Sequence, residues 1–215
     1  MSVCKKSCFL LIFASGFFSH WLQAQSDCEI RKNEKGIQVY SCAVEDSNLK
    51  SIKAVFDLHA ELDQLVSVLR DVSAYSSWQY RMINPKLIRS DANTITYYGE
   101  ISAPWPVSNR DMIVELKFNY DSALRTMEVK ATGLPAALPA VKNVIRVPEF
   151  KAKWHVAETT SHELKIEYEL LINIGGAIPI WIMNIAQAEG PYETFSNLKT
   201  HIHLKKYQNP AYSTN

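Results

Sequence analysis

The sequence predicts an α+β protein in which an antiparallel β-sheet packs against one long C-terminal helix. Within residues 162–173, apolar and charged side chains alternate from Glu163 to Leu170, which is typical of an antiparallel strand with one face in water. Residues 94–120 hold two further strand-like runs, joined through a corner in which Pro104 and Pro106 cannot remain in a central ladder. Apolar side chains then recur at helical spacing over residues 178–205.

The earlier elements follow from the same periodicities. A helix is expected over residues 60–70, where Leu62, Leu65 and Leu69 share one face, and a turn-rich helical stretch continues to Trp78. Alternation and β-branched or aromatic composition predict strands over residues 37–44, 50–58, 86–90, 94–101, 110–120, 125–131, 145–157 and 162–173.

The last helix is expected from Ile178 to Lys205, with Pro179 in its first turn, where a proline is tolerated. Gly190-Pro191 should kink this helix, because the missing proline amide deletes the bond to the Gln187 carbonyl. The apolar stripe of the helix consists of Trp181, Ile185, Ala188, Tyr192, Phe195, Leu198 and Ile202.

The first residues resemble a cleaved secretory signal. Lys5 and Lys6 precede an apolar run over residues 9–18. That run is about ten residues long, whereas a membrane span needs roughly twenty. We therefore expect a signal peptide over residues 1–24, one domain over residues 25–207 and a polar tail over residues 208–215. The mature protein is expected to be soluble and exported, either periplasmic or secreted.

Composition and charge narrow the class of protein. A chain of 215 residues with 47% hydrophobic and 21% charged residues is large enough for one globular core. Removing the leader leaves 21 basic and 22 acidic residues, so nothing in the net charge attracts nucleic acid.

Only Cys28 and Cys42 remain once the leader, with Cys4 and Cys8, is removed. Residues 33–36 form a turn signal near the midpoint between them, so a hairpin there would bring the two thiols opposite each other. We expect a structural disulfide, with a redox-active thiol pair as the alternative.

Four segments carry a resemblance to a known family. Residues 104–111, PWPVSNRD, are similar to the P-x-P-V-S-x-R-D signature of START domains, the lipid-transfer modules related to the steroidogenic acute regulatory protein. Residues 36–40 resemble the first strand of that family, residues 71–78 its D-x(6)-W segment, and residues 175–181 the start of its C-terminal helix. The resemblance covers about residues 28–205. It implies a helix-grip fold, in which a curved antiparallel sheet wraps around the long helix and a lipid lies between them.

A ligand cavity is expected because the strands supply more inward apolar side chains than one helical stripe covers. Glu100 either places a carboxylate in this cavity or lies exposed at a strand end, and both positions remain open. The expected ligand-binding side chains are Tyr98, Glu100, Met112, Val114, Leu116, Phe118, Trp154, Ile166, Tyr168, Trp181, Ile185, Ala188 and Tyr192.

The uncharged loop from Gly133 to Pro139 has two prolines and small apolar residues, which is unusual for a loop that faces water. It is either a lid or a loop packed on the helix. As a lid it would gate the cavity against residues 178–185, with Leu134 and Leu138 in contact and Gly133 as the hinge.

Motifs for catalysis are missing. The sequence has no G-x-S-x-G, no H-E-x-x-H, no paired C-x-x-C and no glycine-rich phosphate loop. His201 and His203 diverge on a helix and cannot share a metal ion. We therefore expect no catalytic residue, cofactor or metal, and a monomer that binds a lipid or other hydrophobic small molecule and touches membranes transiently.

Two alternatives remain open. Polyketide cyclases and aromatases share the helix grip, and Tyr98, Glu100 and Tyr168 would be the candidates for such chemistry. A protein-interaction module with a filled core is the other. Pocket volume distinguishes the module from the binding protein, and the chemical state of a recovered ligand distinguishes the binding protein from the enzyme.

Overall fold

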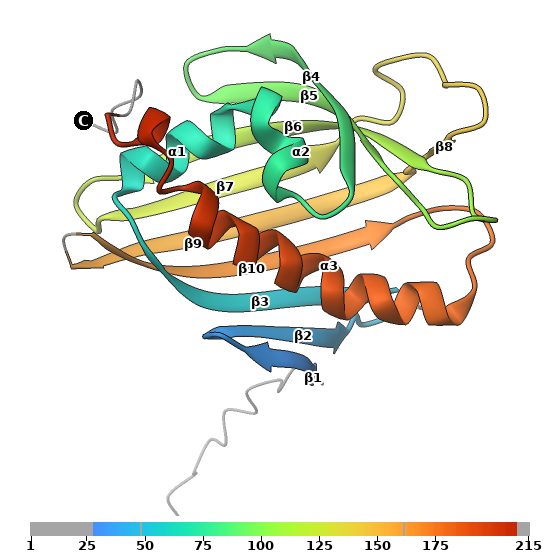
Figure 1. The fold of residues 1–215 in the computed structure, drawn as a ribbon, viewed down its shortest axis with the longest axis horizontal. Helices are drawn as coiled ribbons and strands as arrows, with labels where there is room; N and C mark the ends of the chain where they lie inside the picture. Colours follow the sequence, from blue (N-terminus) through green and yellow to red (C-terminus); the bar gives the residue numbers. More distant parts are fainter. Residues whose placement is uncertain (1–27, 48, 161, 210–215) are drawn as a thin grey trace, which may run out of the picture.

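The computed structural model describes residues 28–47, 49–160 and 162–209 (Figure 1). The expected signal peptide lies outside the described residues, as does most of the expected tail, and both stay predictions. Within the described residues the chain forms one β-sheet with its helices on one face.

The sheet has ten strands in the described part of the chain, in the order β1-β2-β3-β10-β9-β7-β6-β5-β4 (Figure 1). All pairs along this path are antiparallel, and the short β8 pairs with β6 in parallel. The strands are β1 (Cys28–Glu34), β2 (Ile37–Ala43), β3 (Lys50–His59), β4 (Met82–Ser90), β5 (Thr94–Ile101), β6 (Arg110–Asp121), β7 (Thr126–Gly133), β8 (Ile145–Arg146), β9 (Glu149–Thr160) and β10 (Glu163–Asn173).

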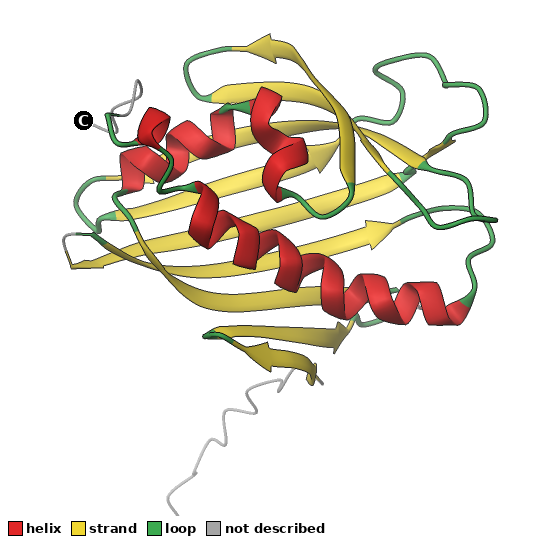
Figure 2. Cartoon of the chain, viewed as in Figure 1, coloured by secondary structure: helices red, strands yellow, loops and turns green. Residues whose placement is uncertain are grey.

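The helices cover one face of this sheet (Figure 2). They are α1 (Leu62–Arg70), α2 (Tyr75–Trp78) and α3 (Ile180–His201), with 3-10 turns at Val72–Ala74 and Lys205–Tyr207. Helix α1 begins at a capping box, in which the Glu61 amide donates to the Gln64 side chain at 2.8 Å. The predicted α+β architecture, an antiparallel sheet around a long C-terminal helix, is confirmed.

Several element boundaries differ from the prediction, and β4 begins at Met82 rather than at residue 86. The strand expected over residues 145–157 is two strands, because the chain leaves β6 at Val147-Pro148 before β9 joins β7 and β10. Pro148 has no amide hydrogen, so it cannot continue a ladder. The last helix spans residues 180–201 and is shorter than expected at both ends.

The core lies between the helices and the concave face of the sheet. Phe195 of α3 is at its centre, 1% exposed. Its ring stacks on Phe56 of β3 at 4.6 Å between centroids and meets Trp154 and Tyr168 edge-on at 5.5 and 5.1 Å. Packing of this kind, in which aromatic rings prefer stacked or edge-to-face contacts, fixes the helix on the sheet.

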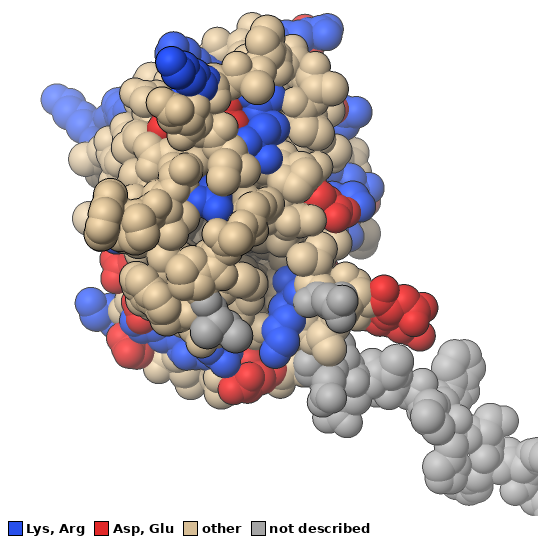
Figure 3. Space-filling view, turned by 90° about the vertical axis from the view of Figure 1, so that its right-hand side faces the viewer, with Lys and Arg blue, Asp and Glu red and all other residues tan. Residues whose placement is uncertain are grey.

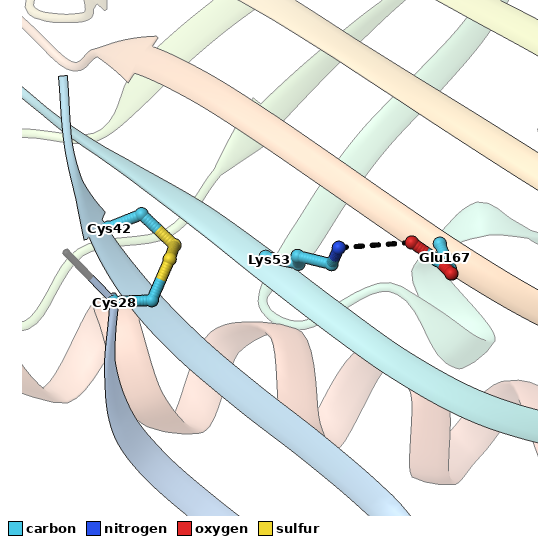
Figure 4. The surroundings of a disulfide bond; sticks show 4 residues. All are labelled: Cys28, Cys42, Lys53 and Glu167. Carbon is cyan, nitrogen blue, oxygen red and sulfur yellow. Dashed lines mark ion pairs between the residues drawn. A yellow bond between two sulfur atoms is a disulfide. The ribbon is translucent and has the colours of Figure 1, made fainter. Parts of the chain in front are cut away.

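The N-terminal hairpin carries the expected disulfide (Figure 4). Cys28 and Cys42 are directly opposite in the β1–β2 register, with an S–S distance of 2.03 Å. The hairpin lies at the edge of the sheet beside β3, whose Lys53 pairs with Glu167 of β10 at 3.0 Å. The bridge therefore closes an edge hairpin that is otherwise attached to the sheet only through β3.

Loss of the disulfide should lower stability measurably. The bridge closes a loop with a sequence separation of 14 residues. In the chain-entropy model a loop of this size contributes ~3 kcal/mol. Urea unfolding of the Cys28→Ser, Cys42→Ser double variant should show a loss of this size, and dithiothreitol should change the wild type but not the variant. Equal midpoints for the wild type with and without reductant would contradict a stabilising role.

Candidate functional site

Helix α3 consists of two halves with different surroundings. In the second half, Tyr192, Phe195 and Leu198 are buried in the core. In the first half, large apolar side chains remain exposed: Trp181 by 54% and Ile185 by 45%. Hydrophobic side chains on a helix that covers a filled core would be buried on one face, so the first half covers the sheet without packing tightly onto it.

Pro191 lies at the junction of the two halves. A proline inside a helix removes one backbone hydrogen bond, here the bond to the Gln187 carbonyl. Figure 1 shows α3 changing direction near its middle, as Gly190-Pro191 predicts. The two halves of α3 therefore meet where the helix lacks one backbone hydrogen bond.

The backbone of α3 comes closest to β1, β2 and β3 on one side and to α2 on the other. The central strands carry small side chains. Ala131 of β7 pairs with Ala152 of β9, and Gly133 follows along β7.

Most of the expected ligand-binding residues lie on this concave face. The strand residues Met112, Val114, Leu116, Trp154 and Ile166 belong to the core cluster, and Phe118 and Tyr168 pack against it. From α3, Tyr192 is buried in the same cluster and Ala188 is half-buried, whereas Trp181 and Ile185 are exposed. Contact of any of them with a ligand stays a prediction.

Tyr98 and Glu100 lie on the other face of β5. Their neighbours Ile95 and Tyr97 are core residues, and successive side chains of a strand point to opposite faces. The Glu100 carboxylate accepts hydrogen bonds from the side-chain amides of Asn84 and Asn109, at 3.1 and 2.7 Å. Of the two positions left open for Glu100, the structure shows the one outside the core.

Tyr97, which is absent from the predicted set of ligand-binding residues, takes the concave position expected for Tyr98. The signal was present in the alternation of Ile95, Tyr97 and Ile101, which is the more apolar of the two parities of this strand. Tyr97 is 5% exposed, and its ring meets that of Tyr75 edge-on at 4.9 Å.

The loop after Gly133 is fastened to the outer face of the sheet. Arg146 donates to the carbonyls of Pro135, Leu138 and Pro139, at 2.6, 3.0 and 3.1 Å. The same guanidinium forms a bidentate pair with the buried Asp111 carboxylate, at 2.8 and 3.0 Å. Such a pair is rigid. The expected hinge, Gly133, is itself paired with Val114 in the sheet.

A different segment meets the start of α3. A hollow of about 480 Å³ opens between the proline corner and the chain that leads into the helix, lined by Pro106, Val107, Ser108, Arg110, Ile145, Ala177, Ile178 and Pro179. The hollow is open to solvent and is not an enclosed cavity. Figure 3 shows that this end of the molecule carries mostly uncharged side chains, and Trp105 of the corner is 91% exposed.

Arg110 connects the two walls of this hollow. Its guanidinium donates to the carbonyl of Ser108 in the corner and to those of Ile174 and Gly175 before α3, the latter two at 3.4 and 3.2 Å. Burial lowers the pKa of this guanidinium. Arg110 is thus a buried cation, 6% exposed, that holds the corner against the start of the helix.

The other end of α3 is held by a polar network around Asp71. Its carboxylate accepts hydrogen bonds from Lys206 at 2.6 Å and from the Tyr207 hydroxyl at 2.9 Å, and the His201 ring lies 3.1 Å from that hydroxyl. Burial acts to raise the pKa of Asp71, but hydrogen bonds from Lys206, Ser73 and Tyr207 outweigh it and lower the pKa to about 2.

Within the described ranges, no group of three or more His, Cys, Asp or Glu side chains could hold a metal ion. No helix among those residues has the length and apolar character needed to cross a membrane.

The Asp71 network predicts an acid-dependent loss of stability. The pKa of Asp71 falls from its ordinary 3.8 to about 2 on folding, which corresponds to about 2 kcal/mol. Because the folded pKa is the lower one, this contribution is full above about pH 4 and is lost as the pH falls towards about 2. Asp71→Asn should therefore lower the unfolding free energy at pH 7 by about 2 kcal/mol and flatten its acid dependence.

Urea unfolding followed by tryptophan fluorescence at several pH values measures this effect. Asp57→Asn, which replaces an exposed aspartate of β3, is the matched control and should change little. An unchanged acid dependence in Asp71→Asn would show that the network does not contribute as argued.

Comparisons with known sequences and solved structures find proteins that are similar to this chain. A scan of protein-family models finds no match. A crystal structure of a STAR-related lipid transfer protein from Xanthomonas axonopodis has 30% sequence identity and a TM-score of 0.75, covering 82% of this chain and 98% of that one. Human phosphatidylcholine transfer protein is 26% identical over 174 residues, 78% of this chain and 79% of that protein. An uncharacterized Pseudomonas aeruginosa protein is 26% identical over 174 residues, 81% of this chain and 86% of its own length.

Proposed function

The chain belongs to the family of StAR-related lipid transfer (START) proteins, and from this premise we propose that it binds a lipid between α3 and the concave face of the sheet. The observation that carries the proposal is the division of α3. Its first half is apolar and lies over the sheet, yet Trp181, Met183 and Ile185 remain exposed. A filled core would bury such side chains, so this half suits a cover over a ligand better than a permanent core element.

The wall of the proposed site favours an apolar ligand. Its described strand residues are aliphatic or aromatic, with alanine and glycine at the centre. Burial of alkyl chains against such a wall contributes about 25 cal/mol for each Å² removed from water. A lipid tail meets this requirement without any specific polar contact.

We propose that the protein binds its ligand without catalysing a reaction. Of the three residues considered for a cyclase, Tyr98 and Glu100 are on the face of β5 away from the core, and only Tyr168 remains beside it. General acid–base catalysis needs groups within hydrogen-bond reach of a bound substrate. We therefore assign no catalytic residue to the protein.

The proposal extends to the place of action. Disulfides persist in oxidising compartments, so Cys28–Cys42 supports an exported protein. Trp105 and Trp181 are exposed at the end of the molecule that carries the hollow. Tryptophan side chains favour the boundary between membrane and water. This end is the proposed point of transient membrane contact, through which a lipid would enter or leave.

Native mass spectrometry of the mature protein, purified from its own host, tests the proposed function. A lipid-sized adduct should be present, and denaturation should release it chemically unchanged. An altered ligand would favour the enzyme instead. Protein free of adduct that also fails to bind a fluorescent fatty-acid probe would contradict the proposal.

The gate can be located by comparing release rates. The sequence predicts that Leu134→Ser with Leu138→Ser speeds release, because it weakens a lid. The attachment of that loop to Arg146 instead favours movement of the first half of α3 at Pro191. Pro191→Ala restores a helical hydrogen bond and should slow release several-fold.

Stopped-flow displacement of a fluorescent fatty acid from both variants and the wild type decides between the two gates. Melting temperatures of the ligand-free proteins provide the control for altered folding. Faster release from the loop double variant, with no change in Pro191→Ala, would identify the loop as the gate.

A further inference from the structure

Arg110 lies on the concave side of β6, at the end of the strand that is nearest the start of α3. Met112 and Val114, the next residues of the same parity, belong to the core cluster. Arg110 also lines the open hollow, together with residues 177–179, which lead into α3. A cation is therefore placed at one end of the proposed lipid site, where the apolar wall ends at a hollow that is open to solvent.

This cation has no carboxylate partner among the residues that the structure describes. Its hydrogen bonds go to three backbone carbonyls, which carry no net charge. Arg146 shows the contrast, because its pairing with Asp111 raises its pKa, whereas burial lowers the pKa of Arg110. Buried charges are normally paired, since their removal from water is costly. Arg110, which is 6% exposed, departs from that rule.

The guanidinium of Arg110 has hydrogen-bond donors left for a ligand. Of its five N–H groups, the three carbonyls take one on each nitrogen, so one remains on Nη1 and one on Nη2. Gly176 keeps space open beside Nη2, because a Cβ at this position would lie 3.5 Å from that atom. A hydrogen bond from a guanidinium to an anionic oxygen is roughly twice as strong as one between neutral groups.

The start of α3 is a second feature that favours an anion. Its N-cap, Pro179, makes no side-chain hydrogen bond, and the first turn carries no acidic residue. The first amides of a helix lack partners within the helix and carry a partial positive charge, so they attract anions. Ile178 and Pro179 line the same hollow as Arg110. An unneutralised guanidinium and an uncapped helix start therefore border one open hollow.

The apolar surroundings favour an amphiphile over a small hydrated anion. Apart from Ser108 and Arg110, the hollow is lined by aliphatic side chains and prolines. A hydrated anion gains nothing from such walls, whereas an amphiphile can bury its tail along the concave face and keep its charged head at the solvent edge. The exposed Trp105 of the neighbouring corner suits the boundary between membrane and water, where such amphiphiles are found.

We propose that the hollow at the start of α3 binds the anionic head of a lipid, a carboxylate or a phosphate, and that Arg110 is its counter-ion. This inference rests on the proposed function and deepens it by naming the ligand class. The tail extends from the hollow along Met112 and Val114, beneath the first half of α3. The three carbonyl bonds hold the guanidinium in place, so the head meets a donor that is already oriented.

The test uses competitors that share one alkyl chain and differ in their head. A fluorescent fatty alcohol, whose binding needs no cation, is displaced by hexadecanoate, hexadecyl phosphate or hexadecanol. The wild type should bind the two anions about 10-fold more tightly than hexadecanol, the effect of one charge-assisted hydrogen bond. Inorganic phosphate at millimolar concentration represents the free anion. It should not compete with hexadecyl phosphate, because it has no tail to bury.

Substitution of Ala177, an exposed residue that lines the hollow, tests the location. Ala177→Glu introduces a carboxylate that neutralises Arg110 and repels an anionic head, so most of the preference for the anions should be lost. Ala177→Gln has nearly the same size without the charge. The two variants should therefore differ in their affinity for the anions and agree in their affinity for hexadecanol. Val141→Glu adds the same charge at an exposed residue outside the hollow and should keep the wild-type preference.

Arg110→Gln removes the cation and should lose the preference for the anions, while its binding of hexadecanol shows that the variant is folded. If the loss of the carbonyl bonds unfolds this variant, the comparison of Ala177→Glu with Ala177→Gln decides the question, because both keep Arg110.

Four results would contradict the proposal in different ways. Equal wild-type affinities for the anions and hexadecanol would overturn the ligand class. Equal preference in Ala177→Glu and Ala177→Gln would overturn the location in the hollow. Competition by inorganic phosphate that Ala177→Glu abolishes would assign the hollow to a free anion instead of a lipid head. Failure of the wild type to bind any of the alkyl probes would overturn the proposed function and this site with it.

Discussion

The packing of the second half of α3 into the concave face of the sheet is the interaction on which the rest of the structure depends. Phe195 contacts three aromatic rings from three strands, and truncating such a residue costs about 3–5 kcal/mol. The Asp71 network holds the adjacent end of the helix. Because this half is fixed, the first half beyond Pro191 can stay unpacked without loss of the fold.

The segment PWPVSNRD acquires a physical explanation from the same arrangement. Arg110 and Asp111 are neighbours on β6 and point to opposite faces, as the strand geometry predicts. Arg110 ties the proline corner to the chain before α3, and Asp111 pairs with Arg146, which holds the loop of residues 134–139. One short sequence therefore fastens two loops on two faces of the sheet.

Local patterns in the sequence predicted the parts of the fold that local physics determines. Alternation located β5, β6 and β10, and the turn signal at residues 33–36 located the hairpin and its disulfide. The break at Pro148 was also present in the sequence and was overlooked. The exposure of Trp181 and Ile185 was not predictable in this way, because it depends on how far the sheet lies from the helix.

The concave face brings together residues of distant strands, and the sequence pattern of one strand does not predict which of them meet. Tyr97 of β5 and Tyr168 of β10 are separated by three intervening strands. Tyr97 nevertheless belongs to the core cluster against which Tyr168 packs. Only the curvature of the whole sheet brings such distant strands to one interior, and no single strand pattern encodes that curvature.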